Sequence, residues 1–448
     1  MTTIQEISGS NYESWGRFPK VDQKAFCPQW RSDVASYFKN KQGDSGSTLP
    51  FGQGRSYGDV CLNGGGSILS SQNLRNFISF DDATGLLICE AGVTLEEIIN
   101  FGLPNGYFLP VSPGTKYVSL GGAIANDIHG KNHHVAGTFG RHVPKFGLVR
   151  SDGQYLECSE DSNPEMYRAT IGGLGLTGFI VWAALQLKPV KNSFIDMDSI
   201  KFGGLDEFFE ISKKSDKDFE YTVAWIDCLA SGDSLGRGIF MRGNHLDKPK
   251  NQCPKEPFKP KLIVPIDAPS WALNHWSVKA FNFAFYNKQI NKEVRKTVHY
   301  DPFFYPLDSV LAWNKIYGKR GFIQFQCVVP SESGHTKIRE ILKVIAESGR
   351  ASFLAVLKEF GTINSPGILS FPRPGTTLCL DFPFEGDITK KLYERLEAIV
   401  NDADGALYPA KDPFMTPESF TKYYPQWKEF SKYIDPGFSS SFWRRVAI

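Results

Sequence analysis

Three glycine-rich loops in the first half of the chain constrain its fold more than any other feature. They span residues 52–66, 114–130 and 172–178, and segments with strand or helix patterns separate them. Glycine permits positive φ and lets the main chain approach a ligand closely, and consecutive backbone N–H groups form concave anion sites. Arg55 is the strong cation beside them. The loops predict a main-chain cradle for a dinucleotide pyrophosphate, and tight turns of an α/β protein are the alternative explanation.

The segments around the loops indicate alternating strands and helices. Residues Leu86–Glu90 have a strand pattern, and Thr94 followed by two glutamates predicts the start of a helix that ends near Gly102. Residues 107–111 are expected to add a short strand, which would complete a strand–helix–strand unit. The lead-in over residues 1–48 is expected to be helical or irregular.

A second strand and helix pattern begins near residue 190. Before it, residues 146–159 predict a hairpin that turns at Asp152-Gly153, residues 164–173 a short helix, and residues 176–190 a long buried strand. After it, the patterns predict strands and helices of an antiparallel α+β domain. The strands are expected at 322–330, 352–361 and 376–384, and the helices at 335–349 and 388–405.

Composition excludes several classes of protein. The chain of 448 residues is long enough for two domains. A net charge of +2 without a basic run argues against nucleic-acid binding. The sequence has no secretory signal pattern and no window near the ~20 apolar residues of a spanning helix, so we expect a cytoplasmic protein. The eight cysteines form no CxxC pair, which favours reduced thiols over disulfides or structural zinc.

Two motifs suggest other functions but lack the required context. Gly173, Gly175 and Gly178 form a GxGxxG pattern, but a predicted helix precedes it and a strand follows, the reverse of a nicotinamide-binding unit. His129, His133 and His134 have a spacing that a zinc site could use, but glycines interrupt the segment and HExxH is absent. We therefore predict no metal site.

Several segments together resemble one flavoprotein superfamily. Six segments are similar to segments of the vanillyl-alcohol oxidase / p-cresol methylhydroxylase superfamily. They are GRSYGD (54–59), PGTKYVSLGGAIANDIHGKNHH (113–134), GLTG (175–178), LAVLKEFG (354–361), LCLDFPF (378–384) and YPAKD (408–412). Within it, they resemble the decaprenylphosphoryl-β-D-ribose 2-oxidase family from about residue 49 to the C-terminus, with DIHGKNHH and AKD the most specific parts.

The resemblance implies a two-domain α+β fold that binds FAD. It implies an FAD-binding domain over 1–190, an antiparallel substrate-binding cap domain over 191–400, and a tail over 401–448 that returns to the first domain. Relatives that bind flavin covalently have a histidine in the first loop, and this chain has none at 54–59, so we predict non-covalent FAD. The implied FAD-binding residues are Gln53, Gly54, Arg55, Ser56, Tyr57, Gly58, Gly114, Thr115, Ser119, Leu120, Gly121, Gly122, Asn126, Asp127, Ile128, His129, Ile180 and Tyr408.

Oxidation of an alcohol by flavin requires a hydride acceptor, which FAD supplies, and an acceptor for the hydroxyl proton. The resemblance implies Lys411 as the first candidate for the proton acceptor and His129 as the second, as base or orienter. The implied substrate-binding residues are Trp225, Gln324, Gln326, Lys358 and Cys379. Strand alternation places Gln324 and Gln326 on one face, and Lys358 could meet a substrate phosphate. The family tends to have Tyr-His before Pro-Leu-Asp, where this chain has Phe304-Tyr305, so a pocket hydroxyl is expected to be missing or shifted.

The resemblance implies oxidation of the 2-hydroxyl of a polyprenylphosphoryl-β-D-ribofuranose to the 2-keto sugar. A partner reductase of the NAD(P)H-dependent short-chain type would complete epimerisation to the arabinose form, an arabinan precursor of the cell wall. An oxygen-dependent alditol or sugar-lactone oxidase and a non-catalytic flavin-binding protein are the alternatives. Oxygen, a quinone or another carrier could accept the electrons. Residues 253–300 mix lysines, prolines and aromatics, which predicts either a lid that contacts the membrane or an ordinary cap-domain loop.

Overall fold

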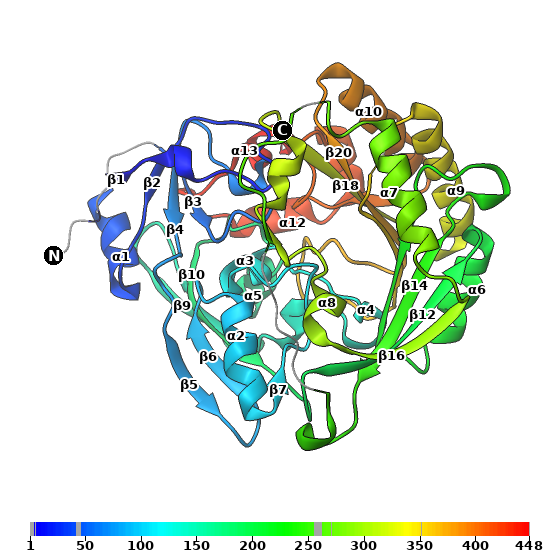
Figure 1. Ribbon diagram of the computed structural model, residues 1–448. Helices are drawn as coiled ribbons and strands as arrows, with labels where there is room; N and C mark the ends of the chain where they lie inside the picture. Colours follow the sequence, from blue (N-terminus) through cyan, green and yellow to red (C-terminus); the bar gives the residue numbers. More distant parts are fainter. Residues whose placement is uncertain are drawn as a thin grey trace.

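The computed structural model describes residue 4 and residues 6–41, 46–254, 262–269, 271–350 and 352–447. Two small sheets from the first 186 residues lie on one side of the molecule, and a larger sheet from later residues lies on the other (Figure 1). The mixture of helices and mainly antiparallel sheets confirms the α+β class.

The first small sheet includes the lead-in of the chain. Its order is β1 (Glu6–Ile7), β2 (Lys24–Phe26), β4 (Ser67–Ser70) and β3 (Thr48–Phe51), and α1 (Arg31–Asn40) follows β2. The prediction of a helical or irregular segment over 1–48 was wrong for β1 and β2. Strands this short carry no periodicity of their own. Antiparallel pairing with β2 defines β1, and parallel pairing with β4, which is distant in sequence, defines β2.

The second small sheet is antiparallel throughout. Its order is β5 (Phe77–Asp81), β6 (Leu86–Glu90), β10 (Phe179–Gln186), β8 (Lys145–Val149) and β9 (Tyr155–Ser159). The accompanying short helices are α3 (Leu120–Ala125), α4 (His133–Ala136) and α5 (Pro164–Thr170). The predicted hairpin of β8 and β9 is confirmed. α5 precedes the GxGxxG pattern and β10 follows it, the reversed order that the sequence predicts.

The predicted helix after β6 is confirmed as α2 (Leu95–Gly102). Thr94 caps it, since the Glu97 N–H donates to Thr94 Oγ1 at 3.3 Å and the Thr94 N–H donates to the Glu97 carboxylate at 2.9 Å. The expected strand–helix–strand unit does not form, because β7 (Tyr107–Phe108) pairs with β11 (Lys188–Pro189) instead of joining the sheet of β6.

The large sheet has eight strands, and every neighbouring pair is antiparallel. Its order is β16 (Glu293–His299), β12 (Phe194–Phe202), β14 (Gly238–His245), β13 (Tyr221–Ile226), β19 (Ala355–Phe360), β20 (Gly375–Pro383), β18 (Phe322–Val329) and β21 (Ala406–Leu407). Packed against it are α6 (Leu205–Ser215), α9 (Ser331–Ser348) and α10 (Asp387–Asp402). The remaining elements here are α7 (His275–Asn287), α8 (Tyr300–Phe304) and the parallel pair β15 (Leu262–Ile263) and β17 (Val310–Leu311).

The end of the chain returns to the first part of the molecule. Its helices are α11 (Pro417–Tyr423), α12 (Trp427–Phe430) and α13 (Ser441–Val446). Arg445 pairs with buried Asp59 at 2.8 Å, and Arg150 pairs with buried Asp435 at 3.0 Å. These buried ion pairs hold the tail in place, so the segment between β21 and α11 lies where the two halves meet.

Candidate functional site

A cavity of about 940 Å³ lies where the glycine-rich loops meet the large sheet. Two of the three loops, 52–66 and 114–130, supply much of one wall, and residues of β13, β18, β19 and β20 supply another. Residues 408–411 reach the cavity from the returning tail. Its volume and its mainly apolar lining with a few polar groups are typical of a cofactor site.

The shape of the loop wall requires glycine at particular positions. Gly54 has φ of +60°, a conformation that side chains with a Cβ rarely adopt. A Cβ on Gly52 would lie 2.2 Å from Ser119 Oγ. Ser119 in turn caps α3 by accepting the Gly122 N–H at 3.3 Å. The first loop therefore packs directly on the start of α3, with main chain facing the cavity.

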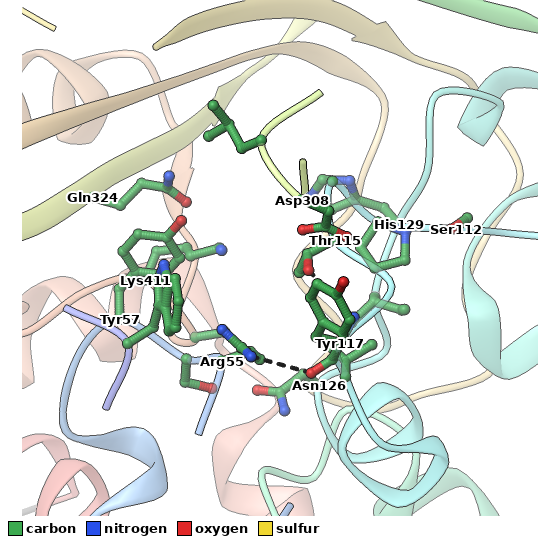
Figure 2. A pocket seen from close by; sticks show the side chains of 18 of the residues that line it. Arg55, Tyr57, Ser112, Thr115, Tyr117, Asn126, His129, Asp308, Gln324 and Lys411 are labelled. Atoms are coloured by element: carbon green, nitrogen blue, oxygen red, sulfur yellow. Dashed lines mark hydrogen bonds between the residues drawn. The ribbon is translucent and has the colours of Figure 1, made fainter. Parts of the chain in front are cut away.

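Two polar groups of this wall fit an anionic dinucleotide. The half-buried Arg55 guanidinium stacks 4.0 Å from the Trp15 ring and donates to the Tyr117 carbonyl at 3.2 Å, and it forms no salt bridge within the described residues (Figure 2). The Asn126 amide oxygen is buried and has no hydrogen-bond partner among the residues that the structure describes. Gly114 faces open space where a Cβ would sit. An unpaired cation, an unsatisfied acceptor and open backbone are the groups that FAD would use.

Most of the residues predicted to bind FAD line the cavity. Those that do are Gln53, Gly54, Arg55, Ser56, Tyr57, Gly114, Thr115, Ser119, Gly121, Gly122, Asn126, Ile128, His129, Ile180 and Tyr408. Gly58, Leu120 and Asp127 lie behind the wall. Asp127 accepts the Gly140 N–H at 2.8 Å and hydroxyl hydrogens from Ser365 and Ser370, so its carboxylate holds loops together.

The sheet wall carries all five residues predicted to bind substrate. Trp225, Gln324, Gln326, Lys358 and Cys379 line the cavity from four neighbouring strands. The two glutamines share one face of β18, as their alternation predicts. Burial raises the pKa of the Cys379 thiol to about 12, so this cysteine is a neutral lining group.

His129 lies between Lys358 and Gln326. Lys358 Nζ is 2.9 Å from His129 Nδ1 and also donates to the Gly130 carbonyl at 2.7 Å, and the Gln326 amide nitrogen is 2.9 Å from His129 Nε2. Burial, with Lys131 nearby, lowers the pKa of Lys358 to about 7. Burial and the lysines also hold the pKa of His129 well below its usual value. His129 is therefore a neutral imidazole that accepts from Gln326, while its Nδ1–H faces a lysine that is readily deprotonated.

Lys411 lies on the side of the cavity where Tyr57 and Gln324 gather (Figure 2). Its Nζ is 4.0 Å from the Tyr57 ring centroid, and the Tyr57 N–H donates to the Ala410 carbonyl at 2.9 Å, which ties the tail to the first loop. Burial lowers the pKa of Lys411, and Cys379 and Asp381 act in the opposite direction. The chain thus places here an amine whose neutral form burial favours.

Asp381 is the carboxylate that faces this lysine from β20. It is fully buried, and the Gln324 amide donates to its Oδ1 at 2.5 Å. Burial raises the pKa of Asp381 to about 7, against the opposing effects of Gln324 and Lys411. Asp381 therefore fixes the direction of Gln324 and tunes the charge of Lys411.

The three histidines of the 114–134 region point to different partners. His134 Nε2 bonds the Phe219 carbonyl at 2.9 Å, and the His133 ring packs 4.5 Å from Phe360. Burial lowers the pKa of His133 to about 3. Among the described residues, no group of three or more His, Cys, Asp or Glu side chains could hold a metal ion.

Sequence reasoning missed several lining residues. Ser112, Tyr117, Lys131 and Asp308 also line the cavity. Asp308 accepts the Lys116 N–H at 2.9 Å and so anchors the second loop. Lys131 stands in the histidine motif, and Asp308 ends the Pro-Leu-Asp segment, so both were within motifs that the sequence singles out. Tyr305, one of the two positions that differ from the family pattern, bonds its hydroxyl to that of the lining residue Ser112, and burial raises the pKa of Tyr305 well above its usual value.

Comparison with known proteins identifies the class and the family. A family model described as an FAD binding domain matches residues 24–159. Together with the cavity, this match defines an FAD-dependent oxidoreductase. A protein of Mycolicibacterium smegmatis, "Decaprenylphosphoryl-beta-D-ribose oxidase", is 36% identical over 410 residues, which cover 89% of this chain and 88% of the relative. The chain belongs to the decaprenylphosphoryl-β-D-ribose oxidase family.

Other relatives match less of the chain or carry no activity in their name. An uncharacterized protein of Streptomyces coelicolor is 30% identical over 80% of this chain and 100% of its own length. A "Putative D-arabinono-1,4-lactone oxidase" of Neurospora crassa is 24% identical over 40% of this chain and 32% of its own length. Among the described residues, no helix is both long enough and apolar enough to span a membrane.

Proposed function

We propose that this chain oxidises the 2-hydroxyl of a polyprenylphosphoryl-β-D-ribofuranose to the 2-keto sugar. The observation that carries the proposal is the meeting of Lys411, His129 and Lys358 in the cavity that the glycine-rich loops also line, in a chain similar over most of its length to an oxidase named for such a substrate. The proposed units are an FAD-binding domain over 1–190, a substrate-binding domain over 191–400 and a returning tail over 401–448.

FAD, when bound along the glycine-rich wall, supplies the acceptor for the hydride that leaves C2 of the sugar. Lys411 accepts the hydroxyl proton at Nζ, because burial favours its neutral amine. His129 is an orienter that acts through its neutral imidazole by holding Lys358 and Gln326 in place, and Trp225, Gln324, Gln326 and Cys379 enclose the sugar ring. Arg55 and the first loop hold the pyrophosphate of FAD.

Lys358 binds the phosphate that links the sugar to its lipid. An arriving phosphate restores the charge of a lysine whose pKa burial has lowered to about 7. Protonated Lys358 then donates to His129 Nδ1, so the hydrogen of the neutral imidazole lies on Nε2. Because Nε2 is then a donor, the Gln326 amide turns its oxygen toward the ring. Substrate binding and the tautomer of His129 are coupled in this way.

The oxidation is the first half of an epimerisation. A separate NAD(P)H-dependent reductase of the short-chain type takes up the 2-keto product and returns hydride to the opposite face. The chain works at the inner face of the membrane, where its lipid-linked substrate resides.

Trapping the ketone tests the proposed reaction. Purified protein with FAD, a polyprenylphosphoryl ribose and an artificial electron acceptor is quenched with borodeuteride. We expect ribose and arabinose products that carry one deuterium, located at C2. Deuterium at another carbon, or unlabelled ribose alone, would exclude the proposed product.

The attachment of FAD is tested separately. We propose dissociable FAD, because residues 54–59 contain no histidine and burial raises the pKa of Cys61, the nearest thiol in that loop, to about 12. Acid precipitation should release all visible flavin absorbance into the supernatant as FAD. Flavin retained in the pellet would show a covalent bond.

A further inference from the structure

One stretch of the chain exposes large apolar side chains that the proposed reaction does not use. Seven side chains between residues 262 and 290 are each at least 62% exposed. These residues, which we call the apolar surface, are Leu262, Ile263, Ile266, Trp271, Trp276, Phe283 and Ile290. Exposed large apolar side chains that gather on one face of a protein mark sites of interaction. Residues 255–261 and 270 of the predicted surface segment lie outside the described residues.

The helix α7 has two different sides. Phe281 and Phe285 line the cavity, and buried Asn282 donates to Asp227 at 2.9 Å, which fixes this side of the helix against the sheet. The helical period places Trp276 and Phe283 together on the opposite side, where they are 74% and 62% exposed. The same helix therefore forms part of the cavity wall and part of the apolar surface.

The charge of this stretch favours an anionic partner. Residues 271–292 contain no aspartate or glutamate. Lys279 lies 5.7 Å from the Trp276 ring and Lys288 lies 4.4 Å from the Phe285 ring, and neither forms a salt bridge in the described part of the chain. Tryptophan and phenylalanine combined with lysine are typical of helices that lie in the interface of an anionic bilayer.

The cavity reaches solvent next to this surface. Phe281 is 44% exposed, and Lys288 and Lys296 are also exposed, yet all three line the cavity. We propose that α7 and the apolar surface lie in the head-group region of an anionic membrane, with Trp276 and Phe283 inserted and Lys279 and Lys288 at lipid phosphates. The cavity then opens at the bilayer, where a lipid-linked substrate can enter without leaving it. This last consequence alone depends on the proposed function.

Vesicle sedimentation tests the proposal with full-length, FAD-loaded protein and no substrate. We expect binding to vesicles of phosphatidylcholine with phosphatidylglycerol, and much weaker binding to phosphatidylcholine alone. The affinity of the double variant Trp276→Ser/Phe283→Ser for the anionic vesicles should fall by at least about tenfold, because two aromatic side chains no longer enter the lipid. Trp30→Ser, at a tryptophan that is 62% exposed and immediately precedes α1, is the matched control and should bind like the unmodified chain.

A second measurement separates lipid binding from other uses of this surface. Lys279→Gln/Lys288→Gln should lose the preference for anionic vesicles. Sedimentation velocity without vesicles should give the same species for all variants. The proposal would be overturned if the unmodified chain did not bind vesicles, or if the Trp276→Ser/Phe283→Ser variant bound them equally well. It would also be overturned if the unmodified chain were a dimer that this variant dissociates, a result that would assign the surface to a second copy of the chain. Because the assay contains no substrate, its outcome is independent of the reaction.

Discussion

The two walls of the cavity are built by different means. The loop wall presents main chain, with glycine where φ is positive at Gly54 and where Ser119 approaches Gly52 within 2.2 Å of the Cβ position. The sheet wall presents side chains, including Lys358 with a pKa of about 7, and the strand β20 of this wall also carries buried Asp381, with a pKa of about 7. The first wall is suited to hold a large ligand by shape and N–H groups, and the second to move protons.

Three lysines line the cavity from different elements, since Lys131 follows the second loop, Lys358 lies on β19 and Lys411 lies in the returning tail. Lys131, Lys358 and Lys411 all have a lowered pKa, for which burial is the largest cause in each case. Asp381 is the buried carboxylate that opposes this effect at Lys411. Burying several amines favours their neutral forms, so an anionic substrate would restore charge where it binds.

Lys411→Ala should have the largest effect on the chemical step. Loss of the proton acceptor should lower kcat by about 10²- to 10⁴-fold, while the bound FAD remains, because Lys411 belongs to the reactive region of the cavity. Steady-state kinetics and the flavin content of the purified variant check both parts. Lys213→Ala, at an exposed lysine of α6, is the control. Unchanged turnover of Lys411→Ala would remove this lysine from the mechanism.

Arg55→Met should weaken the binding of FAD to the loop wall without changing the sheet wall. Loss of a charged hydrogen-bond donor to the pyrophosphate should raise the Kd of FAD by about 10- to 100-fold. Turnover at saturating FAD should change little. Fluorescence titration of the apoprotein measures the Kd, and Arg75→Met, which removes an exposed pair with Glu97, should leave it unchanged. Equal FAD affinity in both variants would contradict the assignment.

Lys358→Met should act mainly on substrate binding. We expect KM to rise about tenfold or more, because a charged contact to phosphate is lost, with a smaller decrease in kcat from the freed His129. The variant should discriminate less between the phosphorylated substrate and a neutral glycoside with the same sugar. A decrease in kcat with an unchanged KM would instead make Lys358 a group that acts only through His129.

Asp381→Asn should give the smallest change, seen in the pH profile. The Asp381 carboxylate raises the pKa of Lys411 against the effect of burial. Asparagine removes that charge and keeps an acceptor for Gln324, so the pKa of Lys411 falls further and its neutral amine persists at lower pH. The acid limb of kcat should therefore move to lower pH. An acid limb that stays in place or moves to higher pH would exclude this coupling.

The loop wall was more predictable from sequence than the contacts of the sheet wall. Gly54, Arg55 and Asn126 stand in local motifs, and strand alternation placed Gln324 and Gln326 on one face. The pairing of His129 with Lys358 joins residues far apart in the chain, and the role of Asp381 depends on burial, so no local pattern contains them. For the same reason β1 and β2 escaped prediction, since pairing with a later strand defines them.

Anaerobic mixing of the FAD-loaded protein with a polyprenylphosphoryl-β-D-ribose tests the central claim most directly. We predict rapid loss of the visible flavin absorbance with formation of one 2-keto sugar per flavin, and no loss with the 2-deoxy analogue, which has no hydroxyl to oxidise. Flavin that stays oxidised with the ribose compound, or that the 2-deoxy analogue reduces equally well, would contradict the assignment of the reaction to this hydroxyl.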